Sequence, residues 1–186
     1  MGRQPGRPLR LFIAVEVPTF SVPGLRPSLT PSGSTTHLTL KFLGDTPEGR
    51  VGEIGHALER SLQGAHEVPV VYHGLGAFPS ARRPRVLWMG VTHGREGLQD
   101  LARRVEEACA GLGFPREDRP FVPHVTLRRF RPGSDVREVP ALLEQHRETT
   151  FGSHTVRAVE LKQSELGNAG ARHTTLVRIP LARPPA

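Results

Sequence analysis

Two short segments of the chain carry a histidine, a threonine and a cation in the same order. The first reads His-Leu-Thr-Leu-Lys at 37–41, and the second reads His-Val-Thr-Leu-Arg at 124–128. Histidine titrates near neutral pH, so one imidazole can accept a proton while another donates one. Threonine hydroxyls and cationic side chains can hold the oxygens of a phosphate. This combination of residues suits acid–base chemistry on a phosphodiester.

Both segments have the residue pattern of a β-strand, in which successive side chains point to opposite faces. In the first segment, alternation assigns Leu38, Leu40 and Phe42 to the core. In the second, it places Arg128, and not Arg129, on the face of the histidine and threonine. If the two polar faces meet across a groove, they present two imidazoles, two hydroxyls and at least two positive charges to a bound phosphate.

A single His-x-Thr in a strand is common by chance, and its ordinary interpretation is a half-buried histidine bonded to the backbone. Here the motif belongs to an internal repeat, because the copies at 37 and 124 are offset by 87 residues. Each half is predicted to run strand, helix, strand, turn-rich loop, strand. The other histidines, His173 among them, have no such setting and are expected to be solvated or turn residues.

Residue periodicity predicts interleaved strands and helices, which indicates an α+β fold. Turn residues cluster at 79–84 and 167–170, where hairpin-like returns are expected. The predicted strands are 10–17, 37–42, 68–75, 85–91, 121–130, 155–161 and 173–181, and the predicted helices are 48–62, 97–112 and 136–146.

The two halves differ in the stretch before each histidine motif. The second half has room for the long helix 97–112, whereas four prolines between residues 18 and 31 cross the equivalent stretch of the first half. Each proline removes a backbone donor and disfavours helix before it, so an irregular loop is expected there. We therefore expect two lobes of unequal size within one domain spanning residues 1–186.

The charge of the chain is positive and is carried almost entirely by arginine. The 186 residues have a formal net charge of +7, and 23 of the 25 cationic side chains are arginines. Arginine forks suit phosphate, so a polyanionic partner is expected. Two clusters favour contact with an RNA backbone over an ordinary solvated face. They are Arg82, Arg83 and Arg85, and Arg128, Arg129 and Arg131.

Other chemistries and locations have little support in the residues. Cys109 is the one cysteine, which excludes a disulfide framework, and its place on an apolar helical stripe favours a core role. Neither HExxH nor a carboxylate cluster accompanies the two motifs, so no metal is expected. The apolar run 11–17 is interrupted by Glu16 and is too short to cross a membrane, so we expect a soluble, cytoplasmic protein.

Longer stretches around the two motifs resemble a known family. HLTLKFLG at 37–44, GLGAFPSARRPRVLW at 74–88, RPFVPHVTL at 119–127 and SEL at 164–166 resemble the bacterial two-histidine phosphoesterases, known as RNA 2′,3′-cyclic phosphodiesterases or 2′-5′ RNA ligases. The resemblance covers nearly the whole chain. It implies a bilobal α+β fold, an internal duplication in which two antiparallel sheets flanked by helices enclose a central cleft.

The resemblance also implies an activity and a set of roles. The activity would be hydrolysis of a 2′,3′-cyclic phosphate RNA end to a 2′-phosphate, with weak reversible 2′-5′ joining and no cofactor. His37 would protonate the leaving 3′ oxygen, and His124 would activate water. Thr39 and Thr126 would hold the phosphate. The residues by themselves leave open which histidine is the acid.

The family's arginine falls on Arg129, three residues after the second threonine. Strict alternation favours Arg128, so this assignment requires a bulge or twist after Leu127. Alternative functions are a 2′-5′ RNA ligase acting on tRNA-like fragments, a phosphodiesterase for small cyclic nucleotides, and an RNA-binding module without turnover. The expected partner is an RNA with a 2′,3′-cyclic phosphate end, no membrane partner is expected, and the protein is expected to be a monomer.

Overall fold

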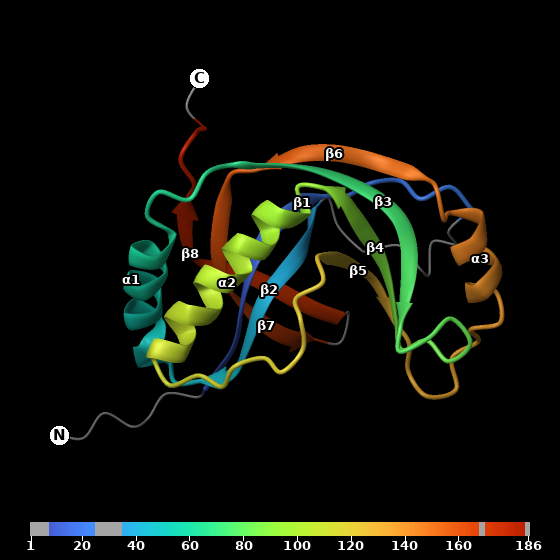
Figure 1. Ribbon diagram of the computed structural model, residues 1–186. Helices are drawn as coiled ribbons and strands as arrows, with labels where there is room; N and C mark the ends of the chain where they lie inside the picture. Colours follow the sequence, from blue (N-terminus) through green and yellow to red (C-terminus); the bar gives the residue numbers. More distant parts are fainter. Residues whose placement is uncertain (1–7, 25–34, 168–169, 185–186) are drawn as a thin grey trace.

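Eight strands form two four-stranded antiparallel sheets in the computed structural model, which describes residues 8–24, 35–167 and 170–184 (Figure 1). The first sheet has the order β2-β1-β7-β8 and the second the order β5-β4-β3-β6. The first sheet consists of β1 (Leu9–Pro18), β2 (Thr35–Thr46), β7 (Ala158–Gly167) and β8 (Gly170–Pro180). The second consists of β3 (Val68–Phe78), β4 (Val86–His93), β5 (His124–Arg129) and β6 (Thr150–Val156).

Three α-helices accompany the sheets within the described part of the chain. A 3-10 turn, Glu48–Arg50, leads into α1 (Val51–Leu62), which packs against α2 (Arg95–Gly111) at one end of the molecule. The third helix, α3 (Val139–Gln145), contacts β3 at the other end (Figure 1). This arrangement confirms the predicted α+β fold with two antiparallel sheets and flanking helices. None of these helices is long and apolar enough to cross a membrane.

The two histidine motifs lie on edge strands that face each other. β2 is the edge of the first sheet and β5 is the edge of the second, and the two strands are in contact. The apolar side chains between the motif residues anchor each strand, because Leu38 and Val125 are both fully buried. The remaining positions of each motif are therefore free to face the space between the sheets.

The duplicated order of elements is present, but the two halves interlock. The first motif lies on β2, which is followed by α1, β3 and β4. The second motif lies on β5, which is followed by α3, β7 and β8. The extra strand β6 lies between α3 and β7. The repeat aligns β4 with β8, yet β4 lies between two strands and β8 forms a sheet edge. The reason is that β4 pairs with β5 of the second half as well as with β3, whereas β8 pairs, among the described strands, with β7 alone.

The single strand predicted at 155–161 is wrong, because the chain passes from one sheet to the other within it. β6 ends at Val156 and pairs with β3, whereas β7 begins at Ala158 and pairs with β1. Arg157 separates the two strands and is exposed. Val156 and Ala158 are both buried, each in the core beside its own sheet. The apolar pattern therefore continues across the break and does not reveal it.

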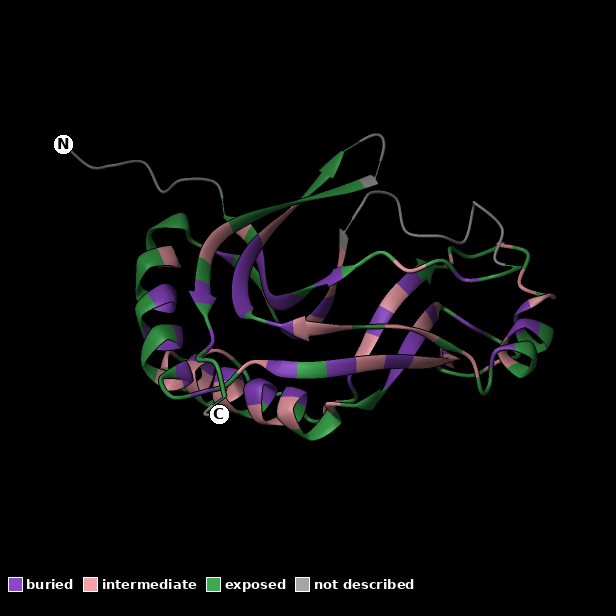
Figure 2. Ribbon diagram, turned by 90° about the horizontal axis from the view of Figure 1, so that it is seen from above, coloured by how far each residue is buried: buried purple, intermediate pink, exposed green. Residues whose placement is uncertain are grey.

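The core lies where the apolar faces of the helices and sheets meet (Figure 2), and the central strands β1 and β7 of the first sheet are buried on both faces over five consecutive residues each. The predicted apolar stripe of α2 is confirmed, since Leu98, Leu101 and Val105 are at most 1% exposed. Cys109 continues this stripe and is fully buried, and burial raises the pKa of its thiol to about 11. Residues 19–24 form neither helix nor strand, and the rest of the predicted proline-rich loop, 25–34, lies outside the described residues.

Candidate active site

Each histidine strand carries a bulge at the leucine that ends its motif. Leu40 has no partner on β1, because Thr39 and Lys41 on either side of it pair with consecutive residues of that strand. Leu127 of β5 is skipped in the same way in the pairing with β4. The two leucines occupy equivalent positions of the internal repeat. A bulge adds one residue to a strand, so the alternation of side chains is shifted after it.

The bulge at Leu127 decides which arginine faces the site. Arg129 pairs with Val86, and both residues line the cavity described below. Arg128 pairs with Leu87, which is fully buried, and does not line the cavity. Directly cross-strand neighbours share a face of the sheet, so the two arginines point to opposite faces. The bulge required by the family resemblance is therefore present.

The bulge at Leu40 overturns the prediction that Phe42 belongs to the core. Phe42 is 56% exposed and lines the cavity, at the position of the repeat that Arg129 occupies in the second motif. Alternation without a bulge would have buried this ring. The site is consequently asymmetric, because an aromatic ring on β2 stands where β5 has a guanidinium.

Lys41 is not available as the second free cation. Its side chain is 2% exposed, and its ammonium donates to both carboxylate oxygens of Glu106 on α2, at 3.0 and 2.8 Å. It also donates to the Pro115 carbonyl at 2.8 Å. This ion pair ties β2 to α2 and to the loop after it. The positive charge expected from both motifs is therefore supplied to the reacting groups by the second motif alone.

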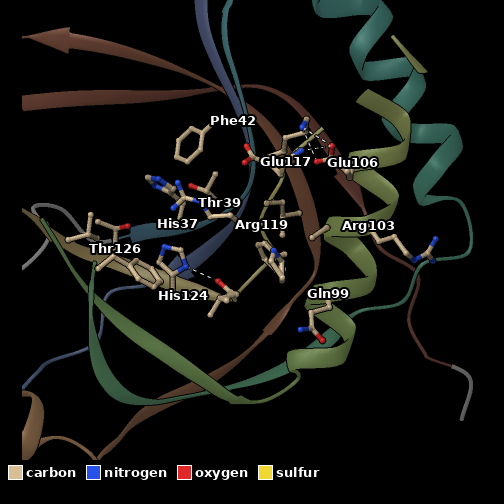
Figure 3. A pocket seen from close by; sticks show the side chains of 18 of the residues that line it. His37, Thr39, Phe42, Gln99, Arg103, Glu106, Glu117, Arg119, His124 and Thr126 are labelled. Carbon is tan, nitrogen blue, oxygen red and sulfur yellow. Dashed lines mark hydrogen bonds and ion pairs between the residues drawn. The ribbon is translucent and has the colours of Figure 1, made fainter. Parts of the chain in front are cut away.

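The five residues singled out in the sequence all line one cavity of about 1020 Å³ between β2, β5 and α2. His37 and His124 lie across from each other, with a threonine beside each (Figure 3). Within the described chain, neither threonine hydroxyl has a hydrogen-bond partner, and Arg129 has no carboxylate partner. The residues in question are His37, Thr39, His124, Thr126 and Arg129.

His124 has a defined tautomer. Its Nδ1 lies 2.7 Å from the Val122 carbonyl, which can only accept, so Nδ1 carries the proton and donates it (Figure 3). The neutral ring then presents an unprotonated Nε2, the atom that a general base needs. Phe78 meets the ring edge-on, with centroids 5.2 Å apart. Burial and the charge of Arg129 lower the pKa of His124, while the Val122 bond opposes them.

His37 is surrounded by rings and positive charge. Burial is the main cause that lowers its pKa to about 4, followed by the charges of His173, Lys162 and Arg129. The His173 ring meets it edge-on, with centroids 4.8 Å apart, and Phe12 contacts both imidazoles. Without a ligand, this imidazole is neutral at pH 7.

His173 is exposed, as predicted for a solvated histidine, but its ring also contacts His37, which the sequence pattern did not predict. It lies on β8, and its contact with His37 of β2 passes over Phe12 of β1 and so crosses the sheet. No local pattern marks such a residue, since its neighbours come from the other end of the chain. A second missed residue is Phe78, which is 37% exposed and lines the cavity beside His124.

Comparison with known proteins agrees with this architecture and confirms the resemblance noted in the sequence. The sequence model of the 2′-5′ RNA ligase superfamily matches residues 29–168, more than half of the chain. The chain belongs to this superfamily. Both histidine motifs lie inside the matched region. No group of three or more His, Cys, Asp or Glu side chains placed to hold a metal ion is found in the described residues of this superfamily member.

Two relatives share the name RNA 2′,3′-cyclic phosphodiesterase. The RNA 2′,3′-cyclic phosphodiesterase of Aquifex aeolicus is 36% identical over 141 residues, covering 75% of this chain and 74% of the relative. The protein of the same name from Aeropyrum pernix is 35% identical over 156 residues, covering 84% and 88%.

Solved structures share the fold. The crystal structure of TT0787 of Thermus thermophilus is 26% identical with a TM-score of 0.71, covering 94% of this chain and 99% of that one. The structure of Escherichia coli LigT complexed with 3′-AMP has a TM-score of 0.70 and covers 95% and 99%. At 23% identity, the latter similarity concerns the fold alone.

Proposed function

We propose that this chain hydrolyses the 2′,3′-cyclic phosphate at an RNA end to a 2′-phosphate, with two histidines as acid and base. The observation that carries the proposal is the meeting, in one cavity, of two imidazoles, two unpartnered hydroxyls and one unpaired guanidinium from two sheets. The names of the relatives from Aquifex and Aeropyrum support the same substrate. The proposal assigns no step to a metal or a cofactor.

The proposed reaction is a single displacement at phosphorus. His124 removes a proton from water through Nε2 as the water oxygen bonds to phosphorus. The bond from phosphorus to the 3′ oxygen breaks, and protonated His37 donates a proton to that oxygen. Arg129 and the two threonine hydroxyls hold the non-bridging oxygens, on which charge increases. One proton is taken up and one is released, so exchange with solvent restores both imidazoles.

The apolar part of the cavity suits the nucleoside. Phe42 and Phe78 expose their rings to the cavity, from β2 and from the end of β3. An exposed aromatic ring is a surface on which a base of any sequence can stack. The Arg129 guanidinium lies on the β5 side of the cavity and the Phe42 ring on the β2 side. The phosphate and the base can therefore bind at different places in the cavity.

Product analysis tests the reaction directly. An oligonucleotide ending in a 2′,3′-cyclic phosphate is expected to yield a 2′-phosphate, with the same rate in the presence of EDTA. A 3′-phosphate product would contradict the proposal, because the bond to the 2′ oxygen would then have broken. Binding without product would favour the RNA-binding module.

The superfamily description keeps 2′-5′ RNA ligation as a second candidate. The same groups would form a 2′-5′ junction if a 5′-hydroxyl took the place of water. Adding an oligonucleotide with a 5′-hydroxyl to the assay separates the two, because a ligase yields the joined strand. All five proposed residues come from one chain, which supports our proposal that the enzyme acts as a monomer. We also propose a cytoplasmic location.

The pH dependence follows from the direction of the histidine pKa shifts. The reaction needs His37 protonated and His124 neutral, so kcat/KM is expected to be bell-shaped against pH, with the lower of the two histidine pKa values at the acid limb and the higher at the alkaline limb. Because the free pKa of His37 is about 4, only a small fraction of the free enzyme carries the protonated His37 near pH 7. A bound phosphate anion favours the imidazolium, so the limb that His37 sets is expected at higher pH in kcat than in kcat/KM.

Replacing His173 by phenylalanine tests the assignment. The ring packing is kept while a titrating imidazole whose charge lowers the pKa of His37 is lost, so the pKa of His37 is expected to rise and the limb of kcat/KM that it sets to move to higher pH. The matched control is His56→Phe, at an exposed histidine on α1 that does not line the cavity. A pH profile in which neither limb moves would contradict the role given to His37.

A further inference from the structure

The two arginine clusters of the sequence lie at the same end of the second sheet in the structure. The backbone N–H of Phe130 donates to the Arg85 carbonyl at 2.9 Å, and Val86 pairs with Arg129. The loop before β4 and the loop after β5 therefore leave the second sheet together. The arginines brought to this end of the sheet are Arg82, Arg83, Arg85, Arg128, Arg129 and Arg131.

These arginines have no acidic partners. None of the six forms an ion pair within the described residues, and residues 79–86 and 124–134 contain neither Asp nor Glu. Arg103 and Arg104 of α2 differ in this respect, since both bind Asp100. Like charges gathered without partners repel one another, and an anionic ligand relieves that repulsion.

The arginine-rich end of the sheet is continuous with the cavity. Arg85 and Arg129 line the cavity itself, together with Phe78 and Pro79, where the loop before β4 begins. Arg82 and Arg83 follow on that loop and are exposed outside the cavity. Positive charge therefore extends from Arg129 and Arg85 in the cavity to Arg82 and Arg83 at the solvent-exposed loop.

The chemistry of this region favours a polynucleotide over a protein or a membrane. Of the exposed large hydrophobic side chains among the described residues, Phe42, Phe78 and Val122 line the cavity and Leu166 lies on β7. The arginine loops therefore offer no apolar anchor. Planar guanidinium forks match phosphate oxygens, and backbone phosphates dominate the affinity of nucleic-acid binding.

We propose that Arg82, Arg83 and Arg131, the arginine surface, bind the backbone phosphates of the RNA strand that precedes the cyclic end. This inference rests on the proposed function, because only the last nucleotide of such a substrate occupies the cavity and the rest of the strand must leave it. The arginine surface makes an oligonucleotide a better substrate than a cyclic mononucleotide. It does so through KM, without contact with the reacting atoms.

The test compares two substrates in one triple variant, R82Q/R83Q/R131Q. For an oligonucleotide with a cyclic end, kcat/KM is expected to fall about tenfold or more at low salt, while that for a 2′,3′-cyclic mononucleotide changes by less than about twofold. The slope of log(kcat/KM) against log salt is expected to lose about 0.7 per phosphate contact removed. The control, R10Q/R60Q/R183Q, removes the same charge from exposed residues that do not line the cavity.

Each outcome separates this proposal from the proposed function. An unchanged oligonucleotide rate, or an equal loss on both substrates, would overturn the arginine surface and leave the phosphodiesterase activity standing. If the wild-type protein hydrolyses neither substrate, binding of an oligonucleotide ending in a 2′-phosphate is measured instead. Weaker binding by the triple variant, with unchanged binding by the control variant, then supports the arginine surface. Equal weakening toward polyglutamate would indicate an acidic protein partner and overturn the RNA assignment.

Discussion

Replacing His124 by alanine is expected to lower kcat/KM for a cyclic-ended oligonucleotide by about 10²- to 10⁴-fold, and His37→Ala is expected to do the same. His124 is held by the Val122 carbonyl with Nε2 free to accept, and among the described residues His37 is the one other histidine that lines the cavity. Water would then have no positioned base. The measurement is kcat/KM with the cyclic-ended oligonucleotide, beside the thermal unfolding of each variant.

The two histidine variants also differ from each other in a way that separates the roles. In His124→Ala, the remaining activity is expected only to fall as pH rises through the pKa of His37. In His37→Ala, it is expected only to rise as pH rises through the pKa of His124. The double variant is expected to be little worse than either single variant, because acid and base act together in one step. Activity that survives either substitution in a folded protein would refute the mechanism, and His56→Ala on the exposed face of α1 is the matched control.

Replacing Arg129 by glutamine is expected to lower kcat by about 10²- to 10³-fold, the usual effect of removing a group that stabilises charge in the transition state. Arg128→Gln is its matched control, because it removes the same charge from the adjacent residue of the same strand. Arg128 lies on the Leu87 face, outside the cavity, so kcat is expected to change by less than about twofold.

The arginine pair is a direct test of the bulge at Leu127. If the alternation of β5 continued without a bulge, the large effect would belong to Arg128 and the small one to Arg129. That reversed order would contradict the pairing of Arg129 with Val86. Equal effects on kcat would show that the two arginines act through general charge, which the salt dependence of the rate would confirm.

Much of the fold and the main site residues could be predicted from the sequence. The strands of both motifs, the long helix α2 and the buried Cys109 follow from local periodicity, because an apolar face must be buried whatever its neighbours are. The juxtaposition of His37 and His124 was expected from the repeat, since equivalent strands occupy equivalent edges of the two sheets.

Three features were decided only by the tertiary structure. The bulges at Leu40 and Leu127 arise from pairing with a neighbouring strand, and they expose Phe42 and turn Arg129 into the cavity. The crossing of the chain between sheets at Arg157 leaves the apolar pattern unbroken.

The contact between His173 and His37 is the third, since it joins β8 to β2 across a whole sheet. Periodicity reports which face of a segment is buried, and it does so one segment at a time. Which residue a bulge skips, and which distant ring meets a catalytic one, depends on the partner strand. Two short sequence motifs therefore determine the residue types of the proposed chemistry. Strand pairing in the tertiary structure determines how these residues are arranged around a phosphate.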